Sequence, residues 1–240
     1  MKKRGWKSLD IILITGDTYI DSPNIGVAVI GNILAKAGYR VGVIAQPDVN
    51  SGDDITRLGE PELFWGITAG SVDSMVANYT ALKKKRRSDD FTPGGENTRR
   101  PDRATIAYSN LIRRHFKNTK PLVLGGIEAS LRRFAHYDFK EDRIRRSILF
   151  DSRADLLIYG MAERQILEAA AILKSGAPLS RLTSIQGAAY VCAKDDLPEK
   201  HILLPAYEAV SQDRLAFAEA FRLSDLEQNP HYGRPLVQPH

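Results

Sequence analysis

The chain has 240 residues, of which 43% are hydrophobic and 26% charged, and its formal net charge is +5. This composition is typical of soluble globular proteins and excludes a disordered chain, a collagen or a coiled coil. No apolar run approaches the roughly 18 residues that a membrane span requires. The basic start MKKRGWKS precedes only a short apolar run without a cleavage site, so it does not match a secretory signal. The sequence predicts a cytoplasmic protein.

Short apolar segments alternate with helical patterns along most of the chain. The predicted strands are residues 9–15, 39–45, 62–68, 121–124 and 154–159. The predicted helices are residues 23–37, 72–79, 103–116 and 162–174. Continuous apolar strands separated by helices are typical of a parallel sheet that is covered on both faces. The pattern therefore predicts an α/β fold with a doubly wound, mostly parallel sheet.

Polar residues and glycines follow two of these strands, at the edge where doubly wound sheets bind their ligands. The five candidates that face a ligand or another domain are Asp17, Asp21, Gly125, Gly126 and Glu128. The two glycines could direct backbone N–H groups at a phosphate or carboxylate, or form a tight turn without a ligand. Asp21 could instead cap the first helix.

Positive charge is concentrated in two stretches. Residues 83–103 hold eight Lys or Arg against four acids, and residues 131–153 hold seven against four. Residues 83–102 lack apolar periodicity and are predicted to form a long loop. Such patches indicate an anionic partner, nucleic acid included, although a solvated surface or a face for another domain explains them equally. The candidates for this contact are Lys84, Arg86, Arg87, Arg132 and Arg133.

The sequence offers no motif for a metal ion or a bound nucleotide. It has one cysteine, Cys192, and its five histidines never occur at i,i+4 spacing. GxGxxG, P-loop and GxSxG motifs do not occur either. We therefore expect no metal site and no cofactor held by this chain alone.

Three parts are predicted along the chain. Residues 1–178 form the α/β domain. Residues 179–226 form a small C-terminal extension, in which segments 187–193 and 201–204 could pair as a β-hairpin before a helix over residues 206–222. The polar, proline-containing residues 227–240 are predicted to form a linker.

Several long strings resemble the N-terminal region of the YgiQ family of radical S-adenosylmethionine (SAM) proteins. They include TGDTYIDSPNIG, RSDDFTPGG, GGIEASLRRFAHYDF and RRSILFDSRADLLIYGMAERQ, and the resemblance covers nearly the whole chain in order. It implies a flavodoxin-like, cobalamin-binding-like domain followed by a radical SAM barrel. In that family a CxxxCxxC motif of the barrel binds a [4Fe–4S] cluster, which acts together with SAM.

The resemblance also shows what this chain lacks. With one cysteine it cannot hold that cluster, and its first loop, GDTYIDSPNIG, has no DxHxxG motif for cobalamin, which favours a repurposed scaffold. We expect an accessory domain that docks a radical SAM barrel in cis and is not catalytic alone, acting on a substrate that the sequence does not identify. The alternatives are a free-standing module for an anionic or nucleotide-like ligand and a nucleic-acid-binding protein.

Overall fold

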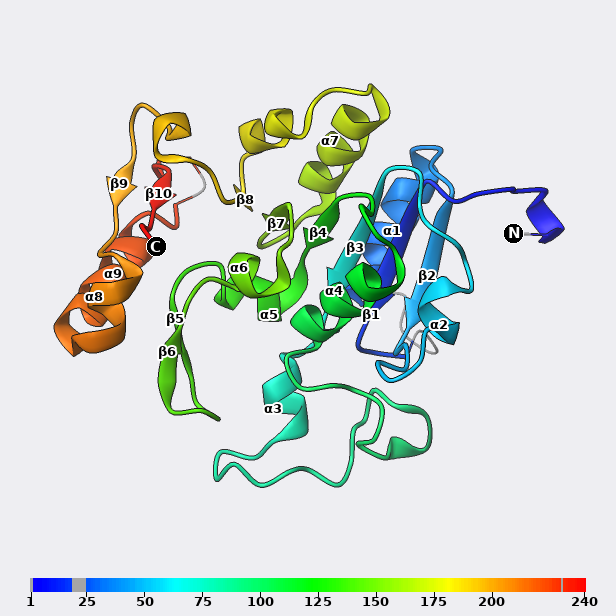
Figure 1. Cartoon of the computed structure of the whole chain (residues 1–240), viewed down its shortest axis with the longest axis horizontal. Coiled ribbons are helices and arrows are strands. Elements are labelled where there is room, and N and C mark those ends of the chain that lie inside the picture. The colour runs from blue at the N-terminus through cyan, green and yellow to red at the C-terminus, as the bar shows by residue number, and fades with distance from the viewer. Residues whose placement is uncertain (1, 19–24, 230) are drawn as a thin grey trace.

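A six-stranded sheet forms the centre of the molecule (Figure 1). The computed structural model describes residues 2–18, 25–229 and 231–240. The strands are arranged in the order β2-β1-β3-β4-β7-β8. Their bounds are β1 Ile11–Thr15, β2 Val41–Ala45, β3 Phe64–Thr68, β4 Leu122–Leu124, β7 Leu156–Ile158 and β8 Ala188–Ala189. The first five run parallel in the flavodoxin-like order, with β8 antiparallel at one edge, so the predicted fold class is confirmed.

Helices cover both faces of the sheet. Helices α1 (Gly26–Lys36) and α7 (Glu163–Lys174) pack on one face, and α4 (Ala104–His115) and α6 (Ile148–Ser152) pack on the other (Figure 1). In β1 the side chains of Ile11 and Leu13 belong to the first apolar layer, and those of Ile12 and Ile14 to the second. This alternation explains why the strands are apolar throughout.

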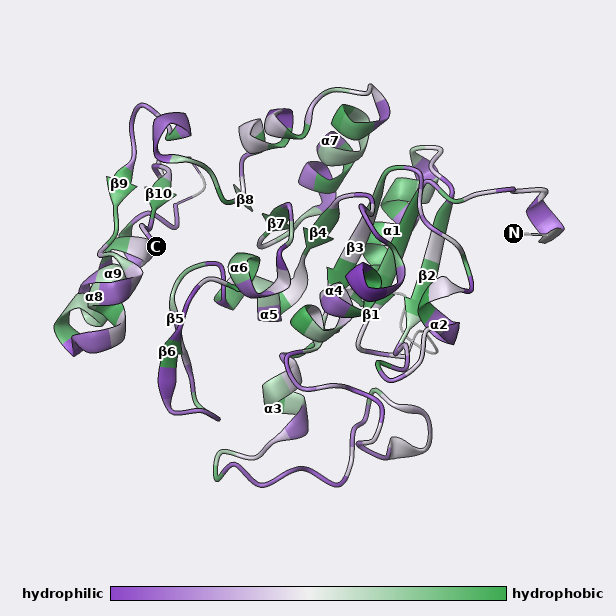
Figure 2. Cartoon of the chain, viewed as in Figure 1, coloured by the Kyte–Doolittle hydropathy of each residue, from purple (hydrophilic) through white to green (hydrophobic). Residues whose placement is uncertain are grey.

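The remaining elements lie around the carboxyl ends of the strands and beyond the β7 edge. They are the helices α2 (Asp53–Thr56), α3 (Ser74–Asn78) and α5 (Gly126–Leu131) and the antiparallel hairpin β5 (His136–Asp138) and β6 (Arg143–Arg145). Between α3 and α4 runs a long, mostly hydrophilic segment, here called the charged loop (residues 79–103; Figure 2). The strands and helices expected within residues 9–174 are all present, but Pro23, the predicted helix start, lies outside the described residues.

The C-terminal part pairs differently from the prediction. Segments 187–193 and 201–204 do not form a hairpin: β8 pairs with β7, and β9 (Ile202–Leu203) pairs in parallel with β10 (Leu236–Val237). The reason is that β7 offers a free edge, where the Tyr159 N–H donates to the Gly187 carbonyl at 3.0 Å.

The helix predicted over residues 206–222 is divided in two. Helix α8 (Tyr207–Gln212) ends before Asp213, and α9 (Arg214–Leu226) begins after it. Asp213 adopts an extended conformation, and its carboxylate accepts a hydrogen bond from the Leu215 N–H at 2.9 Å. Its role as an N-cap explains the break, which apolar periodicity alone did not reveal.

The predicted linker is packed against the rest of the molecule at its end. Gln238 accepts a hydrogen bond from the Ala135 N–H at 2.7 Å. The His240 ring lies 5.5 Å from that of Tyr207 and 4.4 Å from that of Phe150. The three-part division of the chain itself stays a prediction. In the described part of the chain, no helix is long and apolar enough to cross a membrane.

Candidate functional site

An apolar cavity lies at the carboxyl edge of the sheet, between the strand ends and the helices α1 and α7. Its volume is about 370 Å³. Glycines from several segments line it: Gly66 in β3, Gly70 after β3, Gly125 and Gly126 after β4, and Gly160 after β7. This is the edge where doubly wound sheets bind ligands. The cavity therefore lies where the sequence predicts a site, and both glycines singled out from the sequence line it.

The Gly125–Gly126 turn brings the chain close to β3. Gly125 is extended, and its N–H donates to the Ile67 carbonyl at 2.9 Å. Gly126 has a φ of +80°, and a Cβ atom there would lie 2.3 Å from Thr68 Oγ1. Only glycine satisfies both conditions at residue 126. The chain therefore makes a tight turn here, while binding of a ligand at this turn stays a prediction.

Asp17 borders this cavity, but its carboxylate is engaged within the protein. Asp17 is 1% exposed. One carboxylate oxygen accepts from the Ser71 N–H and hydroxyl at 2.6 and 2.8 Å, and the other accepts from Arg100 at 2.8 Å. Both oxygens are thus partnered. Asp21 lies outside the described residues.

Arg100 connects three segments at this edge. Besides Asp17, it donates to the Ala69 carbonyl after β3 at 2.5 Å and to Asp89 of the charged loop at 3.3 Å. Its side chain is fully buried. Burial opposes its charge, but hydrogen bonds and charge from Asp17 and then Asp89 outweigh that effect and raise the pKa of Arg100.

Glu128 bridges the N-termini of two helices. One carboxylate oxygen accepts from the Ser74 N–H of α3 at 2.8 Å and from the Ser74 hydroxyl, and the other accepts from the Thr105 N–H of α4 at 2.9 Å. Glu128 is 1% exposed and does not line the cavity. A carboxylate there satisfies N–H groups that helix ends leave unpaired and complements both helix dipoles.

The five basic candidates are spread over several environments. Arg132 pairs with Asp73, the N-cap of α3, and Arg133 donates to the Ser130 carbonyl at 2.7 Å and lies over the Tyr159 ring. Arg86 donates to the carbonyls of Val76 and Tyr79, while Lys84 and Arg87 are exposed in the charged loop. Contact with nucleic acid stays a prediction.

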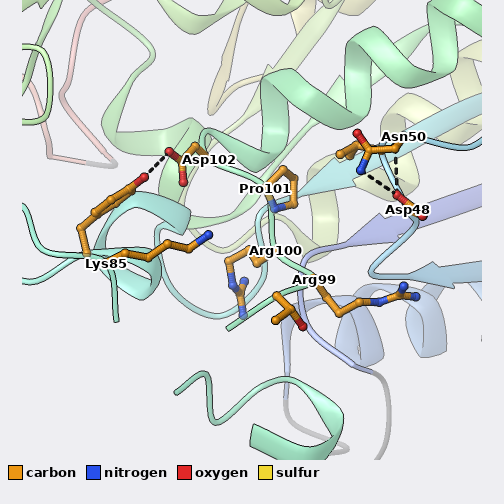
Figure 3. A pocket seen from close by; sticks show the side chains of 10 residues that line it. Asp48, Asn50, Lys85, Arg99, Arg100, Pro101 and Asp102 are labelled. Atoms are coloured by element: carbon orange, nitrogen blue, oxygen red, sulfur yellow. Dashed lines mark hydrogen bonds between the residues drawn. The ribbon is translucent and has the colours of Figure 1, made fainter. Parts of the chain in front are cut away.

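A polar cavity of about 370 Å³ lies where the segment after β2 meets the charged loop (Figure 3). Lys85, Arg99 and Asp102 contribute charge to its lining. Asp102 accepts from the Tyr79 hydroxyl at 2.6 Å, and Arg99 lies 4.0 Å from Asp54. Arg99 thus has an acidic neighbour, and the Asp102 carboxylate has a hydrogen-bond partner within the protein.

Sequence reasoning missed the residues that organise the carboxyl edge. Arg100 and Asp89 lie in a segment predicted only to be a long loop, and Ser71 is far from Asp17 in sequence. Nothing in the local pattern marks Arg100 as buried among the many exposed arginines. Within the described residues, no group of three or more His, Cys, Asp or Glu side chains could hold a metal ion.

These features define a class of protein. It is a parallel α/β domain with flavodoxin-like strand order and a glycine-lined cavity at the carboxyl edge of its sheet. The chain belongs to the Radical SAM N-terminal family, whose model matches residues 1–240. The predicted resemblance to the N-terminal region of radical SAM proteins is thereby confirmed.

Relatives from distant organisms are similar along the whole chain. UPF0313 proteins of Thermotoga maritima and Geobacter sulfurreducens are 54% and 48% identical, each over 99% of this chain. A UPF0313 protein of Methanocella arvoryzae is 49% identical over 100% of it. The alignments cover 41%, 39% and 40% of these relatives, so the chain spans about two fifths of their length.

Among solved structures, the radical SAM methyltransferase TsrM from Kitasatospora setae aligns with 74% of this chain and 28% of its own. The sequence identity is 17% and the TM-score 0.48. A second structure of TsrM, with cobalamin and a [4Fe–4S] cluster bound, aligns with 75% of this chain and 27% of its own, also at a TM-score of 0.48.

The Glu128 bridge predicts a large stability loss on neutral substitution. In Glu128→Gln an amide N–H₂ group would face a backbone donor at one of the two helix ends. We expect the free energy of unfolding to fall by about 1.5–3 kcal/mol, the range for hydrogen bonds to charged groups. Urea denaturation measures this, with exposed Glu199 as a matched control, where Glu199→Gln should change little. Equal stability of both variants would contradict the bridge.

The Gly125–Gly126 turn predicts opposite outcomes for neighbouring glycines. Gly126→Ala meets Thr68 at a positive φ and should destabilise the protein by about 1–3 kcal/mol. A Cβ at Gly125 would meet only the Ile158 carbonyl, at 3.8 Å, so Gly125→Ala should be tolerated. Thermal melts of the two variants check this, and a larger loss at Gly125 would refute the geometry.

The Arg100 network predicts acid lability. Burial alone would raise the pKa of Asp89, but hydrogen bonds from Thr92 and Phe91 and the nearby Arg100 charge hold it below its usual value. As pH falls, the unfolded carboxyl takes up its proton first, near pH 4, and stability drops until the folded carboxyl is protonated too. Asp89→Asn should therefore lower the free energy of unfolding at neutral pH. Below about pH 4, the free energy of unfolding of this variant should fall less steeply than that of the unchanged protein. Denaturation series from pH 3 to 7 compare the variants; parallel curves would contradict the assignment.

Proposed function

We propose that this chain is the accessory domain of a radical SAM enzyme and performs no radical chemistry on its own. The observation that carries the proposal is the combination at the carboxyl edge: an apolar, glycine-lined cavity beside carboxylates that are already engaged. Asp17 and Glu128 have partners on both oxygens. Such a site is suited to holding part of a molecule, since general acid–base catalysis needs a group free to exchange its proton.

The residues of this chain do not fit an iron–sulfur cluster. Three thiolates of a CxxxCxxC motif hold three irons in radical SAM chemistry, and this chain has Cys192 alone. The cluster and the SAM that it cleaves therefore belong, in our proposal, to the part of the longer protein that has no counterpart here. The chain's length relative to its relatives supports this division.

Cobalamin fits this chain only without a histidine from the first loop. The loop GDTYIDSPNIG contains none. In our proposal the domain is a repurposed scaffold whose cavity accepts an apolar part of the enzyme's substrate or cofactor. Gly125 and Gly126 would let that group approach the backbone, while Asp17 holds the neighbouring strand ends in place.

Iron content and SAM cleavage test the proposal. After anaerobic reconstitution with iron and sulfide, the 240-residue chain should hold no stoichiometric cluster and release no 5′-deoxyadenosine from SAM. The longer polypeptide that continues past the His240 codon of the same gene should hold a cluster and, once reduced, release 5′-deoxyadenosine. SAM cleavage by the 240-residue chain alone, or none by the longer protein, would overturn the proposal.

A further inference from the structure

The C-terminal helix pair carries apolar surface that nothing in the described structure covers. Of the thirteen large hydrophobic side chains exposed in the described residues, six lie between residues 188 and 240. They are Val191, Leu203, Leu215, Phe221, Leu226 and Tyr232. Three of the six, Leu215, Phe221 and Leu226, lie on the single helix α9.

Helix α9 is the clearest case. It spans 13 residues, and none of them is buried. Leu215, Phe221 and Leu226 are 78%, 68% and 62% exposed. The other side of α9 packs against α8, and the two helices lie away from the central sheet (Figures 1 and 2). A helix with apolar residues on its outer face gains stability when that face is buried.

The charges on α9 do not mark a site for an anion or a nucleic acid. Arg222 and Glu219 form an ion pair within the helix at 2.7 Å. The exposed side of α9 therefore presents three large apolar side chains together with this pair and with Arg214 and Asp225, whose charges are opposite. Such a surface suits a protein partner, since interfaces combine an apolar core with a polar rim.

The position of the chain end indicates which protein covers this face. The His240 ring lies against Tyr207 of α8, and α8 packs on α9. The C-terminal end accordingly lies beside the helix pair (Figure 1). The relatives are about two and a half times as long as this chain, which aligns with about 40% of them. A polypeptide that continues from residue 240 would start beside α8, the helix on which α9 packs.

We propose that the outer face of α9, formed by Leu215, Phe221 and Leu226, is the docking surface for the domain that follows residue 240 in the longer protein. This inference rests on the proposed function, because it assigns the surface by which the accessory domain binds the radical SAM domain. The apolar contact fixes the orientation of the two domains. It thereby determines what the glycine-lined cavity faces.

Hydrogen exchange on two proteins tests this surface. The 240-residue chain is compared with the longer polypeptide from the same gene, and exchange is followed at the α9 amides. We expect exchange in α9 to slow by at least about tenfold in the longer protein, because docking suppresses local opening. Equal exchange in the two proteins overturns the proposal, and so does a stop codon directly after His240.

A double variant separates docking from folding. Leu215→Gln with Phe221→Gln should leave the melting temperature of the 240-residue chain unchanged, since both side chains are exposed there, and lower that of the longer protein. Leu82→Gln, at a site 80% exposed in the charged loop, is the matched control and should affect neither. If the 240-residue chain instead self-associates through α9 in sedimentation runs, and the double variant abolishes this, the occupant is a second copy and the proposal fails.

The same samples distinguish this failure from failure of the proposed function. A longer protein that holds its cluster and cleaves SAM while α9 exchanges freely would reject the docking surface alone. A longer protein that protects α9 but neither holds a cluster nor cleaves SAM would reject the radical SAM function alone. Both results together would reject both.

Discussion

The arrangement of the carboxyl edge depends on one buried guanidinium. Arg100 lies between Asp17 after β1, the Ala69 carbonyl after β3 and Asp89 of the charged loop. A charge without access to water is tolerated only when it is paired and hydrogen-bonded, so these partners must stay in place. Arg100 thereby ties two central strands and a long, charge-rich loop into one rigid unit.

Neighbouring sequence features follow from that constraint. Gly70 has a φ of +109°, and a Cβ there would lie 2.1 Å from Asp17 Oδ1 and 2.8 Å from Arg100 Nη1. Ser71 donates two further hydrogen bonds to the Asp17 carboxylate, from its N–H and from its hydroxyl. The short segment after β3 is therefore shaped by the buried ion pair on one side. On the other side it lines the apolar cavity, whose form depends indirectly on Arg100.

Sequence patterns predicted the sheet because its determinants are local. Each of the five parallel strands is a continuous apolar run, and the glycine-rich turn after β4 is visible as letters. The roles of Asp17 and Glu128 were not predictable in this way. Their partners Arg100 and Thr105 lie 83 and 23 residues away, and burial of a carboxylate leaves no local pattern. The two-residue strands β8, β9 and β10 are likewise too short to show periodicity.

Two kinds of residue lie at the carboxyl edge of the sheet. Charged side chains fix the positions of the strand ends and helix termini, whereas the glycines and apolar side chains leave a space for a bound group. Asp17 and Glu128, two of the candidates chosen from the sequence, accept hydrogen bonds from backbone N–H groups of neighbouring segments, and their part in a binding site stays a prediction.

Residue-resolved hydrogen exchange in an Arg100→Met variant tests the central claim most directly. Met retains much of the apolar stem of Arg100 but lacks the guanidinium. Asp17 and Asp89 then have no cationic partner at this position. The account predicts faster exchange at the amides of residues 69–71, which include the donor to Asp17, with little change in β2, on the far side of β1 from β3. Unchanged exchange at residues 69–71 would contradict the claim that Arg100 organises this edge.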